Sequence, residues 1–362
     1  MEVCRTGPPW RVAHGSRPCV SGSAGGRDRR PDSLVLRVDS IVRRVTLVRV
    51  RDRPRSLFRL ALCGIALAAT FGCGTDRSDE PAMMDVEAAT RETEEWRARH
   101  EADYRREWVT IAGLHFLEPG GHTAGSAPAN DIVLPPGVPD VIGRFELDGR
   151  RVRFEPEPGS NVRIDGQPVA RAVDLADDGD PEPDELEIGD VRMVVHRSGE
   201  RRSLRVWDPD GEQARGFLGF EWFPIQMDYR VAGRFIPDAS VLELTVMNTF
   251  GDLDTYTTEG VVEFTLQGRT LRLRPFTTRP KRFYLVFKDA SSGDETYEAA
   301  RFLYADLRDD GTTVLDFNQA YNPPCAFNPF TTCPIPLPEN RLPVKVLAGE
   351  RAYPDHPALP IP

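Results

Sequence analysis

Lysine, histidine and long hydrophobic runs are all scarce in this sequence. Of its 362 residues only three are Lys and six are His, whereas 43 are Arg. The longest apolar run, over 60–72, has 13 residues. A helix that crosses a bilayer needs roughly 20 apolar residues. The sequence therefore predicts no membrane-spanning helix in this run.

Several common catalytic and nucleotide-binding motifs are missing from residues 73–362. This part has no Gly-x-Ser-x-Gly nucleophile elbow and no His-Glu-x-x-His zinc motif. It also lacks the Gly-x-x-x-x-Gly-Lys phosphate loop and the Gly-x-Gly-x-x-Gly dinucleotide fingerprint. We therefore expect no cofactor and no metal site of a recognised type.

Charge is divided unevenly along the chain. Residues 1–72 carry 14 Arg, no Lys and 5 acidic residues, a net charge of +9. Residues 73–362 carry 32 basic and 51 acidic residues, a net charge of −19. An acidic body offers no basic surface to a phosphate backbone, so we expect no nucleic-acid partner.

The N-terminal part has the features of an export signal. Residues 51–72 join a basic start to a short apolar run that ends in small residues, as a signal peptide does. The following Cys73 resembles the lipidated cysteine of bacterial lipoproteins, and residues 73–81 form a polar tether. We therefore expect a cell-envelope lipoprotein anchored to a lipid bilayer. Cleavage after Ala68 is the alternative, and it would give a soluble periplasmic or secreted protein.

Residues 1–50 do not fit this export signal. They are rich in Arg, Gly and Ser and have no core pattern. The strong preference for Arg over Lys is typical of GC-rich genomes, in which chance open frames upstream of genes are common. We expect translation to begin near Val48 or Val50, so that residues 1–50 are a misassigned upstream segment.

Only two cysteines follow Cys73, namely Cys325 and Cys333. In an oxidising envelope this pair predicts a disulfide that closes a nine-residue loop. A metal site with two thiolates is the alternative, but no His or further Cys lies nearby in the sequence.

The distribution of apolar residues predicts a mainly β fold with one N-terminal helix. Within residues 82–108, the spacings of three and four between Ala89, Thr93, Trp96, His100 and Tyr104 predict a helix that docks on a sheet through this face. Residues 109–353 alternate with period two between turn signals such as Asp148-Gly149, Asp165-Gly166 and Gln267-Gly268, which predicts an antiparallel sandwich or barrel-like body. The clearest predicted strands are Val191–Arg197, Ser203–Trp207, Ser240–Met247, Val261–Leu266, Arg269–Pro275, Arg282–Lys288, Ala300–Tyr304 and Thr312–Phe317.

Two segments of the β body invite functional interpretations. Within residues 109–172, the segments Gly125–Leu134 and Ile164–Val169 resemble the opening and closing turns of forkhead-associated sandwiches, which bind phosphothreonine through an Arg and a Ser-x-x-His turn. Here Ser126 stands at the Arg position and no such turn follows, so only the geometry is expected. Residues 174–190 hold nine acidic residues and no basic one. A solvated hairpin loop is favoured there over a calcium loop, because the spacing does not match an EF-hand.

The C-terminal part carries the most distinctive motif. Asp-Phe-Asn at 316–318 is followed by Tyr-Asn-Pro-Pro-Cys-Ala-Phe at 321–327 and Cys-Pro at 333–334. With these motifs the chain, over about 96–353, resembles an uncharacterised bacterial family, the domain of unknown function 1684. The resemblance implies a β-rich bacterial protein, often exported or lipid-anchored, with no established activity.

The same part holds the candidate site residues. Arg301 is suited to bind an anionic group, and Tyr297 and Tyr321 offer faces for a sugar or another ring. Asp316 and Glu339 are weak candidates for an acid–base pair. The remaining candidates for a polar ligand are the amides Asn318, Asn322 and Asn340. Each also has a structural interpretation, as an ion pair, a rigid turn or a loop cap.

Two functions follow from these residues. The favoured one is an envelope protein that binds a small polar ligand or serves as a scaffold for an envelope protein. The alternative is a hydrolase or lyase that acts on a glycan or an acyl ester through a carboxylate acid or base. The alternative requires the two carboxylates to converge in one cleft.

Overall fold

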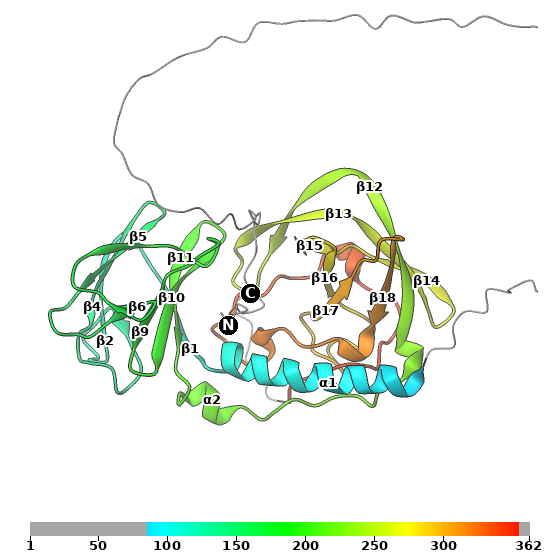
Figure 1. Cartoon of the computed structure of the whole chain (residues 1–362), viewed down its shortest axis with the longest axis horizontal. Coiled ribbons are helices and arrows are strands. Elements are labelled where there is room, and N and C mark those ends of the chain that lie inside the picture. Colours follow the sequence, from blue (N-terminus) through cyan, green and yellow to red (C-terminus); the bar gives the residue numbers. More distant parts are fainter. Residues whose placement is uncertain (1–84, 355–362) are drawn as a thin grey trace, which may run out of the picture. The chain divides into compact units, whose positions relative to one another are not determined.

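The computed structural model describes residues 85–354, and their fold is mainly β. Eighteen strands form four sheets, and every pair of neighbouring strands except β2–β3 is antiparallel. Figure 1 labels most of these strands. No closed barrel occurs in the described residues. The predicted fold class is therefore confirmed. The segments 1–50, 51–72 and 73–81, with Cys73, lie outside the described residues.

A long helix precedes the sheets. Helix α1 (Val86–Tyr104) begins after Asp85, whose carboxylate accepts a hydrogen bond from Ala88 N. The hydroxyl of Thr93, on its buried face, donates to Asp316 at 3.0 Å and so docks the helix. The helix continues as a π-helical turn, η1 (Arg105–Val109). Among residues 85–354, no helix combines the length and hydropathy that crossing a bilayer requires.

Two sheets pack face to face in residues 111–207. A six-stranded sheet has the order β1-β11-β10-β9-β6-β7, and a five-stranded sheet has the order β3-β2-β4-β5-β8. Their bounds are β1 Ile111–Phe116, β2 Gly120–Gly125, β3 Ile132–Val133, β4 Gly143–Asp148, β5 Arg151–Pro156, β6 Arg163–Ile164, β7 Gln167–Pro168, β8 Val173–Leu175, β9 Glu185–Ile188, β10 Val191–Ser198 and β11 Arg201–Trp207.

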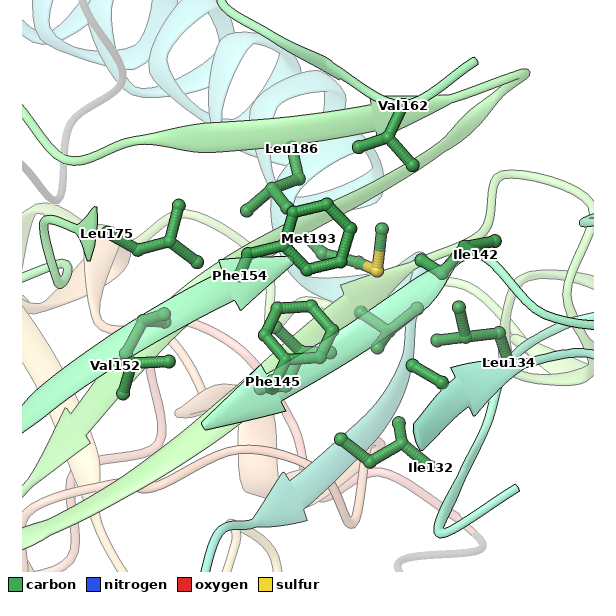
Figure 2. Close-up of a cluster of buried hydrophobic side chains, with 14 of the residues drawn as sticks. Ile132, Leu134, Ile142, Phe145, Val152, Phe154, Val162, Leu175, Leu186 and Met193 are labelled. Atoms are coloured by element: carbon green, nitrogen blue, oxygen red, sulfur yellow. The ribbon is translucent and has the colours of Figure 1, made fainter. Parts of the chain in front are cut away.

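The core of this sandwich is built by side chains from both sheets. Figure 2 shows Phe145 and Phe154 of one sheet gathered with Leu186 and Met193 of the other. Along β4 and β5, buried and exposed residues alternate, as period two requires. Strands of both sheets also come from residues 173–207, and a separate forkhead-associated-like unit over 109–172 stays a prediction.

Residues that favour tight turns join the strands of several hairpins. Asp165-Gly166 joins β6 to β7, and Gln267-Gly268 joins β13 to β14. All four of these residues have positive φ, the conformation that a tight two-residue hairpin turn needs. Gly149, with φ of +61°, begins the turn between β4 and β5. The predicted turn signals are confirmed at these sites.

The second half of the β body contains the other two sheets. Their orders are β14-β13-β12-β18 and β15-β16-β17. The bounds are β12 Arg230–Met247, β13 Leu253–Leu266, β14 Arg269–Leu273, β15 Phe276–Arg279, β16 Arg282–Phe287, β17 Arg301–Asp306 and β18 Thr312–Asp316. Short helical segments are α2 Glu212–Gly216, η2 Met227–Tyr229, η3 Phe317–Gln319, η4 Pro324–Ala326 and η5 Pro338–Asn340.

Strand β12 is longer than predicted. It begins at Arg230, ten residues before the predicted start at Ser240. Gly233 and Pro237 interrupt the alternation in the sequence and hide this part of the strand. The structure accommodates the interruption as an irregularity between Pro237 and Leu242, where the register against β13 shifts.

Candidate functional site

An aromatic pocket lies where α1 and η1 meet the second half of the β body. Its volume is about 440 Å³, within the range of small-molecule sites. Eight of its lining residues are Trp, Tyr or Phe. The lining is Trp96, Arg99, His100, Asp103, Tyr104, Trp108, Tyr256, Thr278, Arg279, Arg282, Tyr284, Phe302, Tyr304, Tyr321, Pro324, Thr332, Cys333 and Pro334. The wall is thus made of rings with a few polar groups between them.

His100 is packed into the aromatic wall. Its ring stacks on Trp96 with a centroid distance of 4.7 Å and lies 4.5 Å from the ring of Tyr321. Burial lowers its pKa to about 3, so the ring is neutral at neutral pH. Its Nε2 atom is buried and has no hydrogen-bond partner among the described residues. Because His100 lines the pocket, this orphaned polar atom is a candidate hydrogen-bond partner for a ligand there.

The tyrosines of the pocket are neutral phenols. Burial raises the pKa of Tyr104, Tyr284 and Tyr321 well above its usual value near 10. Tyr304 shares a hydrogen bond with Tyr321. The guanidinium of Arg282 lies 4.9 Å from the centre of the Tyr304 ring. The phenols therefore provide flat apolar faces with hydroxyls that can donate or accept a hydrogen bond.

Charged groups of the pocket are mostly cationic. Arg99, Arg279 and Arg282 belong to the lining, against one carboxylate, Asp103. Arg99 lies 3.7 Å from Glu95, and Arg282 lies 3.3 Å from Asp306. These two pairs are partly exposed and are therefore weak enough to yield to another anion. This excess of guanidinium groups favours a ligand that carries a negative charge.

Arg301, a predicted ligand contact, is fully buried and has internal partners. Its Nη1 atom lies 3.0 Å from Asp289 and donates to the carbonyl of Val346 at 2.9 Å. Its Nη2 atom donates to the carbonyl of Ala348. The guanidinium thus ties β17 to the 289 turn and to the C-terminal segment, and it is not part of the pocket lining.

Asp316 and Glu339, the predicted carboxylate pair, have different partners. Asp316 is buried and pairs with Arg230 at 2.6 Å. Glu339 is exposed and pairs with Arg274 at 2.5 Å. They share no hydrogen bond, and neither belongs to the pocket lining. The geometry therefore gives the paired-carboxylate mechanism no support.

The three predicted amides are buried and join backbone segments. Asn318 accepts from Gln226 N and donates to Gln226 O, both at 2.9 Å. Asn340 donates to the carbonyls of Arg274 and Val286. Asn322 donates to the carbonyl of Arg351 at 2.7 Å. Each amide thus replaces a main-chain hydrogen bond that an irregular segment lacks.

Of the two predicted tyrosines, Tyr321 belongs to the pocket. Tyr297 is buried elsewhere, with its hydroxyl 3.3 Å from the carbonyl of Cys325. Cys325 and Cys333 are both buried free thiols in this structure. Cys333 Sγ accepts from Cys325 N at 3.4 Å, and the predicted disulfide is not formed.

Sequence reasoning missed a chain of three polar side chains that ends at the pocket. Nδ1 of His196 lies 2.6 Å from Asp178, and its Nε2 lies 2.8 Å from the hydroxyl of Thr332. Asp178 belongs to the acidic segment that was predicted to be a solvated loop. In the structure the exposed fraction of its side chain is only 14%, because it pairs with His196 and Arg205. The sequence carried no local signal for this arrangement.

Glu350 is a buried carboxyl that sequence reasoning also missed. One oxygen accepts from Asn322 N at 2.8 Å. Burial raises the pKa of Glu350 to about 8, and the bonds from Asn322 and the charge of Arg301 only partly oppose this shift. The native protein therefore keeps this proton at a pH where the unfolded chain has lost it.

A pH dependence of stability follows. Between about pH 4.5 and 8 the native state binds one proton more than the unfolded state at Glu350, so the free energy of unfolding falls as pH rises. In Glu350→Gln this contribution is removed. Urea unfolding from pH 5 to 9 should show a decline in the wild type that is smaller in the variant. Parallel curves for the two proteins would contradict the assignment.

Comparison with known proteins finds a similarity in the C-terminal part of the chain. Residues 215–351 match the model of the family described as "Protein of unknown function (DUF1684)". A search of curated proteins found no match. Among solved structures, the solution NMR structure of an uncharacterized protein of Haloarcula marismortui is similar. The identity is 28%, the similarity covers 40% of this chain and 82% of that chain, and the TM-score is 0.34.

The family match spans β12 to β18 and the loops that carry Tyr321 and Thr332. The resemblance predicted over 96–353 is thus found in residues 215–351, and it supports a domain of unknown function 1684 in that part of the chain.

Proposed function

We propose that this chain is a small-ligand-binding protein whose site is the aromatic pocket. The observation that carries the proposal is the lining itself, in which rings surround a buried His100 Nε2 that lacks a partner among the described residues. Rings of this kind bind flat molecules by stacking, and the orphaned nitrogen supplies a directional hydrogen bond. The three lining arginines select a ligand with a negative charge.

The ligand class that fits is a ring-bearing molecule with one anionic group. The proposed site differs from the predicted one, because Arg301 and the three amides bond to other parts of the protein and none of them lines the pocket. Tyr321 is the residue that the two sites share. The anion would be bound by the arginines of β15 and β16 in place of Arg301.

We propose that the protein acts as a lipoprotein of the cell envelope. The support is the signal-like segment 51–72 followed by Cys73, together with the resemblance to a family whose members are often exported. A Cys325–Cys333 disulfide belongs to the same proposal. Cys333 Sγ lies 3.4 Å from the backbone nitrogen of Cys325, and an oxidising envelope would join the two neighbouring thiols.

A pocket-filling variant tests the binding proposal. Thr278 lines the pocket, so Thr278→Trp places an indole in the space where a ligand ring would lie. The probe is 2-naphthoate, an aromatic ring system with one carboxylate. We expect calorimetric titration of the full chain to show binding that weakens at least about tenfold in the variant, a loss of about 1.4 kcal/mol.

The matched control is Thr265→Trp, which adds the same side chain at an exposed position on β13. This variant should bind the probe as the wild type does. Equal binding by all three proteins would place the probe outside the pocket and contradict the proposed function.

A further inference from the structure

Asp178, His196 and Thr332 are arranged in the order carboxylate, imidazole and hydroxyl. His196 lies on β10, and Asp178 lies in the loop between β8 and β9. The second oxygen of Asp178 accepts from Arg197 N at 2.9 Å, which fixes the carboxylate beside the ring. Thr332 lies in the loop after η4 and is part of the pocket lining. These three hydrogen-bonded side chains therefore extend from the first sandwich to the wall of the pocket.

The charges of the three groups determine where the protons lie. Burial opposes the ionisation of Asp178, but the hydrogen bonds from His196 and Arg197 and the charge of Arg205 outweigh it and hold the pKa of Asp178 at about 2, so its carboxylate is ionised. Nδ1 of His196 then donates to this carboxylate, and Nε2 is left to accept the proton of the Thr332 hydroxyl. Burial and the charge of Arg205 lower the pKa of His196, which keeps the ring neutral and leaves Nε2 unprotonated to accept a proton.

Arg205 places a positive charge beside the hydroxyl. Its Nη2 atom lies 3.5 Å from Thr332 Oγ1, and its Nη1 atom lies 3.6 Å from Asp178. Its Nε atom is buried and has no partner among the described residues. A guanidinium in this position stabilises negative charge that develops on an oxygen beside Thr332.

We propose that Thr332 is the nucleophile of an acyl-ester hydrolysis, with His196 as the general base and Asp178 as the residue that orients it. The inference rests on the proposed function, because the aromatic pocket must hold the ring of the ester next to Thr332. It differs from the acid–base mechanism considered for Asp316 and Glu339. The substrate class is an ester that joins an acyl group to a ring-bearing alcohol, with one anionic group on the ring.

The reaction balances with water as the second substrate. Thr332 Oγ1 attacks the ester carbon while His196 Nε2 takes its proton, and Arg205 faces the oxygen that becomes negative. The carbon–oxygen bond to the alcohol breaks, the alcohol leaves with the proton from His196, and the acyl group stays on Thr332. Water then attacks the acyl group with His196 again as base, which releases the carboxylic acid and restores the threonine hydroxyl.

If Asp178, His196 and Thr332 have a purely structural role, a different result is expected. If the Thr332 hydroxyl only ties the loop to β10, its removal changes stability by about 1 kcal/mol and affects no reaction. Thr332 is only partly buried, whereas His196 and Asp178 are largely covered, so the hydroxyl is the member that a ligand in the pocket can reach.

The test uses the full chain and 6-acetoxy-2-naphthoate, which adds an ester to the ring of 2-naphthoate and keeps its carboxylate. We expect the wild type to release 6-hydroxy-2-naphthoate, and we expect Thr332→Val to lower kcat/KM by about 100-fold or more. Thr332→Ser keeps a hydroxyl and should retain measurable turnover. The matched control is Thr331→Val, because the Thr331 hydroxyl binds the carbonyl of Asn328 and is not bonded to His196. This variant should react as the wild type does.

Binding and turnover are read out separately. An acetyl group found on the Thr332 peptide by mass spectrometry would support the nucleophile directly. Hydrolysis that persists in folded Thr332→Val would overturn the inference. Binding of 2-naphthoate without ester hydrolysis by the wild type would overturn it while leaving the proposed function intact. If the wild type neither binds 2-naphthoate nor hydrolyses the ester, both the proposed function and the inference about Thr332 are overturned.

Discussion

Arg301→Ala is expected to lower the free energy of unfolding by about 3–5 kcal/mol, because it leaves a buried charge without its partner. Asp289 is buried, and its carboxylate faces the guanidinium at 3.0 Å. The carbonyls of Val346 and Ala348 lose their donor in the same substitution. Chemical denaturation followed by tryptophan fluorescence measures the loss.

Arg272→Ala is the control for this prediction. Arg272 also pairs with a carboxylate, Glu263, at 2.7 Å, but its side chain is 63% exposed. Such surface pairs contribute about 0–1 kcal/mol, so this variant should unfold almost as the wild type does. If Arg301→Ala were equally harmless and instead abolished binding of 2-naphthoate, Arg301 would be a ligand contact and the structural assignment would be wrong.

Gly349→Ala has the second large expected effect, because the residue is constrained both by its backbone conformation and by its neighbours. Its φ is +79°, and an added Cβ would lie 2.2 Å from the carbonyl oxygen of Ala320 and 2.7 Å from that of Phe317. Both close atoms belong to the backbone, so the segment must shift. We expect a loss of about 3 kcal/mol or more, since strain and overpacking add.

Gly311 separates the two causes. Its φ of +80° is nearly the same, but a Cβ added there meets nothing within 4 Å. Gly311→Ala should therefore show the conformational cost alone, about 1 kcal/mol. Thermal unfolding of the two variants measures the difference. Equal losses would show that the close contact of Gly349 with the 317–320 segment does not matter.

The fold could largely be predicted because its signals are local. Buried and exposed residues alternate along β4 and β5, and Asp165-Gly166 and Gln267-Gly268 lie at the turns of their hairpins. The beginning of β12 was missed where Gly233 and Pro237 break the alternation. A bulge accommodates such residues, and its position depends on pairing with β13, which no local pattern reports.

The site could be predicted only in part because its residues are brought together by the fold. Tyr321 was named from a distinctive motif, and it lies in the pocket. Its partners Trp96 and His100 were interpreted as part of the docking face of a helix. The same face also lines the pocket, so the two interpretations agree. His196 is 18 residues from Asp178 and 136 from Thr332, so nothing in the sequence indicated their contact.

Residue type alone also misled the choice of polar contacts. Arg301 and Asn340 have the chemistry of ligand-binding groups, but the same chemistry satisfies buried carbonyls in irregular backbone. The C-terminal segment is rich in proline and makes few hydrogen bonds of the kind that join strands. Side chains such as Arg301 and Asn340 therefore donate to main-chain carbonyls in their place. Burial decides between the two roles, and burial follows from the tertiary structure.

The most direct test of the central claim is a crystal structure of the full chain with 2-naphthoate. The account predicts that the naphthalene ring lies in the aromatic pocket beside Trp96 and Tyr321. It also predicts that the carboxylate lies toward Arg282 and that a ligand group or a bound water reaches His100 Nε2. A pocket that holds only solvent at saturating probe, with 2-naphthoate bound elsewhere or not at all, would contradict it.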